Sequence, residues 1–273
     1  MSQASTDRTR HLIALRKTCA ERPEIELKPT SQTDQFFETM RPMKRGWLLP
    51  FLVMTDDAIW GRWDHWARTR INGKMLDEAI PQIEWAGEGR EGSRKHIEHC
   101  LNYVSNHGHW QGWTSWQYMD YFLDWILFGF GYTQTMPNEP LGCEGAAKRL
   151  YQVFTLERLQ AWPHDYIGDI MADNQHGRHL GFYPTPMTVV ELMTKINFSD
   201  TEDMRDKSVT DPCLGTGRML LCASNYSYRL YGMDINPTVI KAALVNAYIY
   251  APWMVKPFPF WDGHNESLRS KAV

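Results

Sequence analysis

Over the first 160 residues, hydrophobic positions recur mainly at spacings of three and four. This is the period of an α-helix, and it is clearest in three stretches, 75–86, 93–107 and 115–131. A polar segment at about 7–21 also favours a helix, and loops rich in Gly, Pro and Asn separate the later stretches. The pattern predicts a helical N-terminal domain over residues 1–160.

After about residue 160, short apolar runs alternate with helical segments. The runs 207–212 ("KSVTDP") and 229–235 ("RLYGMDI") predict strands, and 217–227 and 236–250 predict the helices that follow them. A third short strand is expected at 258–263 ("FPFWDG"). Alternation of strands and helices favours a parallel sheet with right-handed crossovers. We therefore expect an α/β protein, with a second domain at residues 161–273.

An amphipathic helix is also expected at 185–196, immediately before the first of these strands. Thr185 is suited to be its N-cap, and Pro186 suits the first helical position, where a missing N–H costs little. Tyr183 would pack as an aromatic staple on the same helix start.

Net charge, aromatic content and cysteine usage limit the kinds of function that the chain can have. The net charge is −3, so any contact with DNA must come from a local surface rather than from overall charge. Twelve tryptophans favour an aromatic core, with base-stacking platforms as the alternative. Five scattered cysteines without a CxxC pair, no apolar leader and no long apolar run predict a cytoplasmic protein that does not cross a membrane.

Histidine and cysteine gather in one short stretch, at His96, His99, Cys100, His107 and His109. These residue types suit zinc, but their spacing follows no zinc pattern, and the helix expected at 93–107 accounts for them without metal. We expect no metal site.

The stretch 211–220 ("DPCLGTGRML") carries the clearest chemistry. Asp211 ends a predicted strand, at the sheet edge where open α/β folds bind ligands. Gly215 and Gly217 allow a sharp turn and a close approach of the backbone to a ligand, and a helix is expected to begin near Arg218. A carboxylate beside this loop suits a ligand that carries an ammonium group better than it suits a pyrophosphate.

Asp234 ends the next predicted strand, 17 residues after Gly217. This is close to the spacing at which an acidic residue binds ribose hydroxyls in nucleotide-binding folds. Asp234 could equally form the N-cap of the helix that begins near Pro237, and both roles can hold together.

Taken together, three motifs resemble N6-adenine DNA methyltransferases, and most of all the modification subunits of type I restriction-modification systems. They are Tyr183-Pro-Thr185-Pro186, Asp211-Pro-Cys-Leu-Gly215-Thr-Gly217, and Gly232-Met-Asp234-Ile-Asn-Pro237 with Asn246 downstream. The resemblance covers roughly residues 165–250. It implies a partial Rossmann-like domain that binds S-adenosylmethionine and acts in DNA methylation.

The resemblance also implies roles for individual residues. Tyr183 and Thr185 would contact the methionine moiety, Asp211 and the Gly215–Gly217 backbone would hold its amino and carboxylate ends, and Asp234 would bind the ribose. For the adenine ring the candidates are Asp262 and Asn265, and we favour Asp262.

The catalytic loop of the resembling family, an Asn, Asp or Ser followed by Pro-Pro and an aromatic residue, has no counterpart here. The sequence contains no Pro-Pro pair, so the catalytic residues are unknown. We expect the domain to be truncated after its third strand, with a protein partner or a second copy covering the incomplete sheet. The alternatives are a non-catalytic relative, acting as an accessory subunit or an anti-restriction decoy, and a cofactor-dependent enzyme with another substrate.

Overall fold

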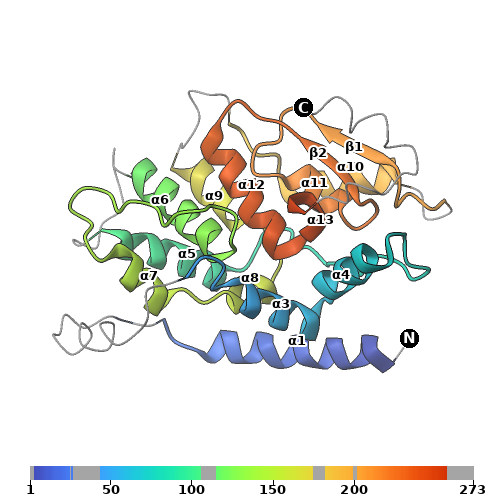
Figure 1. Ribbon diagram of the computed structural model, residues 1–273, viewed down its shortest axis with the longest axis horizontal. Coiled ribbons are helices and arrows are strands. Elements are labelled where there is room, and N and C mark those ends of the chain that lie inside the picture. Colours follow the sequence, from blue (N-terminus) through green and yellow to red (C-terminus); the bar gives the residue numbers. More distant parts are fainter. Residues whose placement is uncertain are drawn as a thin grey trace.

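A computed structural model describes residues 3–24, 26, 44–105, 115–174, 182–198 and 202–256 of the 273. These residues form a mostly helical structure with a small two-stranded parallel sheet (Figure 1). The helices before the glycine-rich loop are α1 (Gln3–Glu21), α3 (Leu49–Ile59), α4 (Arg62–Asn72), α5 (Glu91–Val104), α6 (Ser115–Gly129), α7 (Ala146–Val153), α8 (Glu157–Ala161), α9 (Tyr166–Asp173) and α10 (Met187–Asn197). The remaining elements are β1 (Ser208–Asp211), α11 (Arg218–Ala223), β2 (Arg229–Gly232), α12 (Pro237–Tyr250) and α13 (Pro252–Val255).

The sheet has the parallel arrangement expected from the sequence. β1 pairs with β2 in a register that runs from Ser208 opposite Arg229 to Asp211 opposite Gly232. The crossover between the strands is α11, which packs against both of them, and α10 packs beside α11. The strands predicted at 207–212 and 229–235 are therefore confirmed, while the third predicted strand, 258–263, lies outside the described residues.

The helix predicted at 75–86 is wrong. This segment has no regular secondary structure, although it buries Ile80 and Ile83 at the spacing that suggested a helix. Pro81 removes a backbone donor from its middle. Asn225 replaces a helical partner: its side chain accepts from Ile83 N at 3.0 Å and donates to Ile83 O at 2.9 Å.

The start of α10 also differs from the prediction. The helix begins at Met187, so Pro186 is the N-cap instead of the first helical residue, and no side chain caps the helix. Thr185 is therefore not the N-cap. Its backbone carbonyl instead accepts a hydrogen bond of 2.9 Å from the Arg218 guanidinium, which fixes the chain just before the helix.

One hydrophobic core joins the N-terminal and C-terminal halves of the chain. The cluster includes Trp125 and Phe122 of α6 together with Val239 and Tyr248 of α12, and α12 packs along α6. None of the nine tryptophans within the described residues is exposed, which supports the structural interpretation of the aromatic composition. The division of the chain near residue 160 stays a prediction.

A buried arginine crosses between the same two halves. Arg62 of α4 is fully buried and donates to the backbone oxygens of Tyr250 (2.8 Å) and Ser224 (2.6 Å), which end α12 and follow α11. Its guanidinium lies 4.3 Å from the centre of the Trp253 ring. No helix in the described part of the chain is both long enough and apolar enough to cross a bilayer.

Candidate cofactor site

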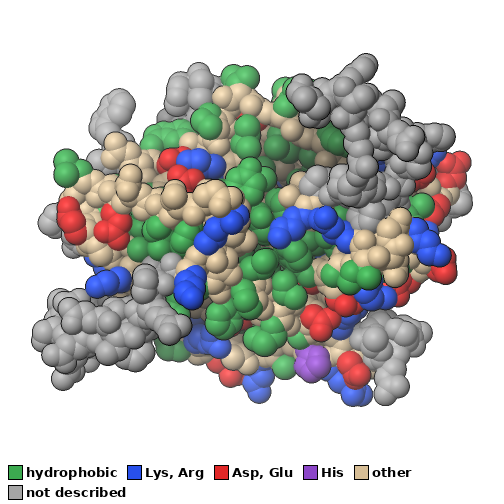
Figure 2. Space-filling model, viewed as in Figure 1, with side chains coloured by type: hydrophobic (Ala, Val, Ile, Leu, Met, Phe, Trp, Pro, Cys, Tyr) green, Lys and Arg blue, Asp and Glu red, His purple; other side chains and the backbone are tan. Residues whose placement is uncertain are grey.

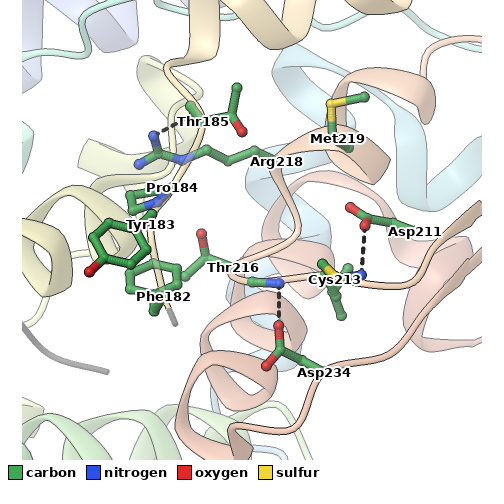
Figure 3. A pocket seen from close by; sticks show the side chains of 12 residues that line it. Phe182, Tyr183, Pro184, Thr185, Asp211, Cys213, Thr216, Arg218, Met219 and Asp234 are labelled. Carbon is green, nitrogen blue, oxygen red and sulfur yellow. Dashed lines mark hydrogen bonds between the residues drawn. The ribbon is translucent and has the colours of Figure 1, made fainter. Parts of the chain in front are cut away.

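A cavity of about 230 Å³ lies where β1 and β2 end. Its lining brings together five of the residues selected from the sequence, namely Tyr183, Thr185, Asp211, Gly215 and Asp234 (Figure 3). Gly217 follows directly as the N-cap of α11. Small-molecule sites usually occupy about 300–1,000 Å³, so this cavity is smaller than a typical one.

The glycine-rich loop turns in the way that the sequence suggests. Gly215 has φ +54° and Gly217 has φ +90°, a region that residues with a side chain rarely adopt. A Cβ at Gly217 would also lie 3.4 Å from the Cβ of Ala243 on α12. The two glycines therefore allow the loop to reverse between β1 and α11 while α12 packs closely against it.

Two carboxylates hold the strand ends in place. Asp234 Oδ2 accepts from Gly215 N at 2.8 Å, and its Oδ1 accepts from Asn236 N at 2.9 Å. Asp211 Oδ1 accepts from Cys213 N at 3.0 Å. Each carboxylate oxygen has two lone pairs, so both residues retain acceptor capacity toward the cavity.

Asp234 is not the N-cap of α12. That position belongs to Asn236, whose side-chain oxygen accepts from Thr238 N at 3.0 Å. The sequence correctly predicted a side-chain cap at the start of this helix, but the capping residue is Asn236 and not Asp234. Because Asn236 satisfies the helix, the Asp234 carboxylate can bind the glycine-rich loop instead.

The segment with Tyr183 and Thr185 forms the opposite wall of the cavity (Figure 3). Phe182 is buried at its start, and a Cβ at Gly215 would lie 3.4 Å from the Phe182 ring. Tyr183 is 69% exposed at the rim, where its ring can cover a bound molecule. Sequence reasoning missed Phe182, which directly precedes the motif.

A buried carboxylate underneath the loop was also missed. Asp165, fully buried, accepts from Gly168 N (2.9 Å) and Asn246 Nδ2 (2.8 Å) on one oxygen. On the other it accepts from Thr216 Oγ1 (2.5 Å) and Arg218 Nε (2.7 Å). These four bonds connect α9, the glycine-rich loop, α11 and α12, so Asp165 positions the floor of the cavity.

The network continues through Arg218 to a histidine. Arg218 Nη2 donates to Asp169 Oδ1 at 2.5 Å, and the other Asp169 oxygen lies 2.6 Å from His164 Nε2. Burial acts to raise the pKa of Asp169, but the His164 hydrogen bond and the Arg218 charge outweigh it, so this pKa is lowered. Asp169 is therefore a stable anion that balances the buried Arg218 charge.

Other candidate residues lie elsewhere. Asp262 and Asn265 lie outside the described residues, as do His107 and His109. His96 has ordinary partners, with Glu24 Oε2 at 2.8 Å from Nδ1 and Thr155 N donating to Nε2 at 2.9 Å. The described residues contain no group of three or more His, Cys, Asp or Glu side chains that could hold a metal ion.

Comparison with known proteins agrees with this geometry. Residues 165–251 match the family model described as N-6 DNA Methylase. The match begins at Asp165 and includes every described residue of the cavity network except His164. No curated protein and no solved structure matches the chain. The resemblance to the N6-adenine DNA methyltransferase family is therefore confirmed over residues 165–251, about a third of the chain.

Proposed function

We propose that the cavity binds S-adenosylmethionine and that the protein acts in N6-adenine DNA methylation. The observation that carries the proposal is the convergence of Asp211, Asp234 and the Gly215 turn on one cavity inside the N-6 DNA methylase segment. The Rossmann-like character of the domain, its place in restriction-modification and its DNA substrate are part of the same proposal.

The donor and acceptor set fits the cofactor. An ammonium and two ribose hydroxyls need acceptors, and Asp211 and Asp234 supply carboxylate oxygens with capacity to spare. The backbone turn at Gly215 and Gly217 leaves no Cβ between the ligand and the loop. The exposed Tyr183 ring and the buried Phe182 ring supply apolar surface for the methionine chain.

When bound, S-adenosylmethionine supplies a methyl group on a positively charged sulfur. The chain's own residues would bind and orient it: Asp234 would hold the ribose, Asp211 would hold the ammonium, and the Asp165 network would keep the loop in place. Precise placement of the residues that contact the cofactor matters, because small displacements of the reacting atoms strongly reduce the rate of methyl transfer.

Completion of the site by a partner belongs to this proposal. Tyr231, Met233 and Ile235 alternate along β2 and its continuation, and they are 51%, 61% and 80% exposed. Parallel sheets are normally covered on both faces, so this apolar face favours a covering polypeptide, either another protein or a second copy. That polypeptide would be the source of the Pro-Pro-aromatic loop that this sequence lacks.

Calorimetric titration with S-adenosylmethionine and with its demethylated product tests the cofactor proposal. We expect saturable binding of both, reduced in Asp211→Asn and unchanged in the surface control Asp7→Asn. A folded protein that binds neither compound would contradict the proposal. Transfer of a labelled methyl group to unmethylated DNA, measured with and without candidate partners, then separates an enzyme from a non-catalytic relative.

Cys213 provides a second readout that needs no catalysis. It lines the cavity and is the exposed one among the five cysteines; the other four are buried. Alkylation of Cys213 by iodoacetamide, followed by mass spectrometry, should slow when the demethylated product is bound. Equal labelling rates with and without saturating product would place that molecule outside the cavity.

A further inference from the structure

Helix α10 presents a second hydrophobic face to solvent. Its inner face, which includes Met187 and Val190, packs against α11. Its outer face carries four large apolar side chains at positions i, i+3, i+4 and i+7, namely Val189 (42% exposed), Leu192 (59%), Met193 (42%) and Ile196 (74%). We call these four residues the α10 stripe. The solvent side of a surface helix is normally polar, so the stripe indicates a face that another polypeptide covers.

No charged residue interrupts the α10 stripe. The exposed residues directly beside it are Thr188 at its start and Asn197 at its end, and both are neutral. The face of the molecule in Figure 2, in contrast, mixes hydrophobic, basic and acidic side chains. Like charges therefore do not oppose the packing of the stripe against a copy of itself.

The spacing of the stripe suits a two-fold symmetric contact. Positions i, i+3, i+4 and i+7 read the same in both directions along a helix, so two antiparallel copies of the stripe match. With a two-fold axis through the middle of the stripe, Val189 of one copy lies opposite Ile196 of the other, and Leu192 lies opposite Met193. Each of these contacts then occurs twice in the pair.

The charges near the stripe are complementary in the same arrangement. Lys195 follows Thr188 by about two helical turns, so both lie on the same side of α10. At the start of the helix this side meets the loop of Gly87 and Glu88. A Cβ at Gly87 would lie 3.0 Å from Thr188 Cγ2, and Glu88 lines a cavity together with Met187, the first residue of the helix. Glu88 and Lys195 are exposed, and neither forms an ion pair with a described residue. A two-fold axis reverses the helix direction, so Lys195 of each copy approaches Glu88 of the other.

We propose that the α10 stripe is a dimerisation surface, on which α10 of a second copy of this chain packs in antiparallel orientation. The contact differs from the covering of β2 proposed above, because α10 packs on α11 rather than on the strands. Since α10 begins immediately after the Thr185 wall of the cofactor cavity, the two cavities would lie at opposite ends of the helix pair. A standard interface uses about 20–30 residues from each partner, and the stripe with its flanks supplies fewer, so the dimer should be weak and reversible.

Sedimentation velocity over about 1–200 µM protein tests the proposal. We expect the unmodified protein to change from monomer to dimer within this range. Leu192→Glu should keep the protein monomeric, because the dimer would bury its carboxylate between two apolar helix faces. The matched control is Ile13→Glu in the middle of α1, a site of similar exposure (62%), and this variant should dimerise like the unmodified protein. Circular dichroism of each variant checks folding.

Exchange of the two charges separates contacts between copies from effects within one chain. Lys195→Glu and Glu88→Lys should each weaken the dimer by about 3- to 10-fold, because each variant places like charges opposite one another. An equimolar mixture of the two variants should restore association, since their heterodimer again pairs opposite charges at both positions.

A protein that stays monomeric throughout the concentration range would overturn the proposal and would assign the stripe to a different protein. A dimer that persists in Leu192→Glu would also overturn it, because the contact would then lie elsewhere. Equal association of the mixture and of the separate charge variants would reject the antiparallel arrangement. The assay contains no S-adenosylmethionine, so its outcome is independent of cofactor binding.

Discussion

The Asp234 carboxylate and the Gly215 backbone are joined by a 2.8 Å hydrogen bond between Oδ2 and N. This bond ties the end of β2 to the turn after β1, two segments that are 19 residues apart in the sequence. The residue expected to bind the ribose thus also shapes the loop that would hold the methionine end. Its two roles can be separated because the carboxylate has more lone pairs than the protein uses.

Asp234→Asn should weaken S-adenosylmethionine binding much more than it destabilises the fold. The amide loses the negative charge and one acceptor, which costs about 1.5–3 kcal/mol of binding, or roughly 10- to 100-fold in affinity. The amide oxygen can still accept from Gly215 N, but the amide nitrogen then replaces the acceptor of Asn236 N. The loss of that one hydrogen bond should lower the melting temperature by about 2–4 °C. Calorimetry and thermal unfolding measure the two effects, with Asp7→Asn as the control. An unfolded variant would show that the loop contact is the more important role.

Local motifs predicted the strands, the glycine turn and most of the cavity lining, because each depends on residues close in sequence. Asp211 and Asp234 lie at strand ends, and Gly215 and Gly217 need positive φ, so their pattern is readable. Asp165 could not be found in this way. It contacts Thr216, 51 residues away, and only the folded chain brings these residues together.

The segment 75–86 shows the opposite failure. Its apolar spacing matched a helix, yet Ile80 and Ile83 are buried without regular secondary structure, and Asn225 bonds both backbone groups of Ile83. A sequence pattern indicates which residues are buried. It does not indicate which distant side chain will bond their backbone groups in place of a helical hydrogen bond.

Gly217→Ala should destabilise the protein by about 1–3 kcal/mol, because alanine at φ +90° is strained. Urea unfolding measures this loss. Gly92→Ala is the matched control, since a Cβ there meets nothing within 4 Å and its φ is not positive. That variant should change stability by no more than about 1 kcal/mol. Equal effects at both positions would contradict the strained turn.

Arg218→Met should cost about 3–5 kcal/mol, because it leaves the buried Asp165 and partly buried Asp169 without their shared cation. The contact with Thr185 O would also be lost, so the cavity wall should loosen and cofactor affinity should fall. Arg94→Met removes a half-buried arginine that also bridges two acids, Glu98 and Asp173. Because these two ion pairs are solvent-accessible, their loss should lower the free energy of unfolding by about 1 kcal/mol or less. Similar losses in the two variants would argue against a special role for the buried network.

Asp56 should make the protein less stable as the pH rises toward neutrality. Burial raises its pKa from 3.8 to about 7, although hydrogen bonding from Trp63 N and the Arg62 charge act in the other direction. Between about pH 4 and pH 7 the unfolded chain ionises Asp56 while the folded chain keeps its proton, so the free energy of unfolding decreases. The slope should approach about 1 kcal/mol per pH unit, and the contribution should be constant above pH 7. Asp56→Asn, which cannot ionise, should lack this term, so urea unfolding of both proteins from pH 4.5 to pH 7.5 isolates it. Parallel stability curves for the two proteins would show that Asp56 stays ionised in the folded state.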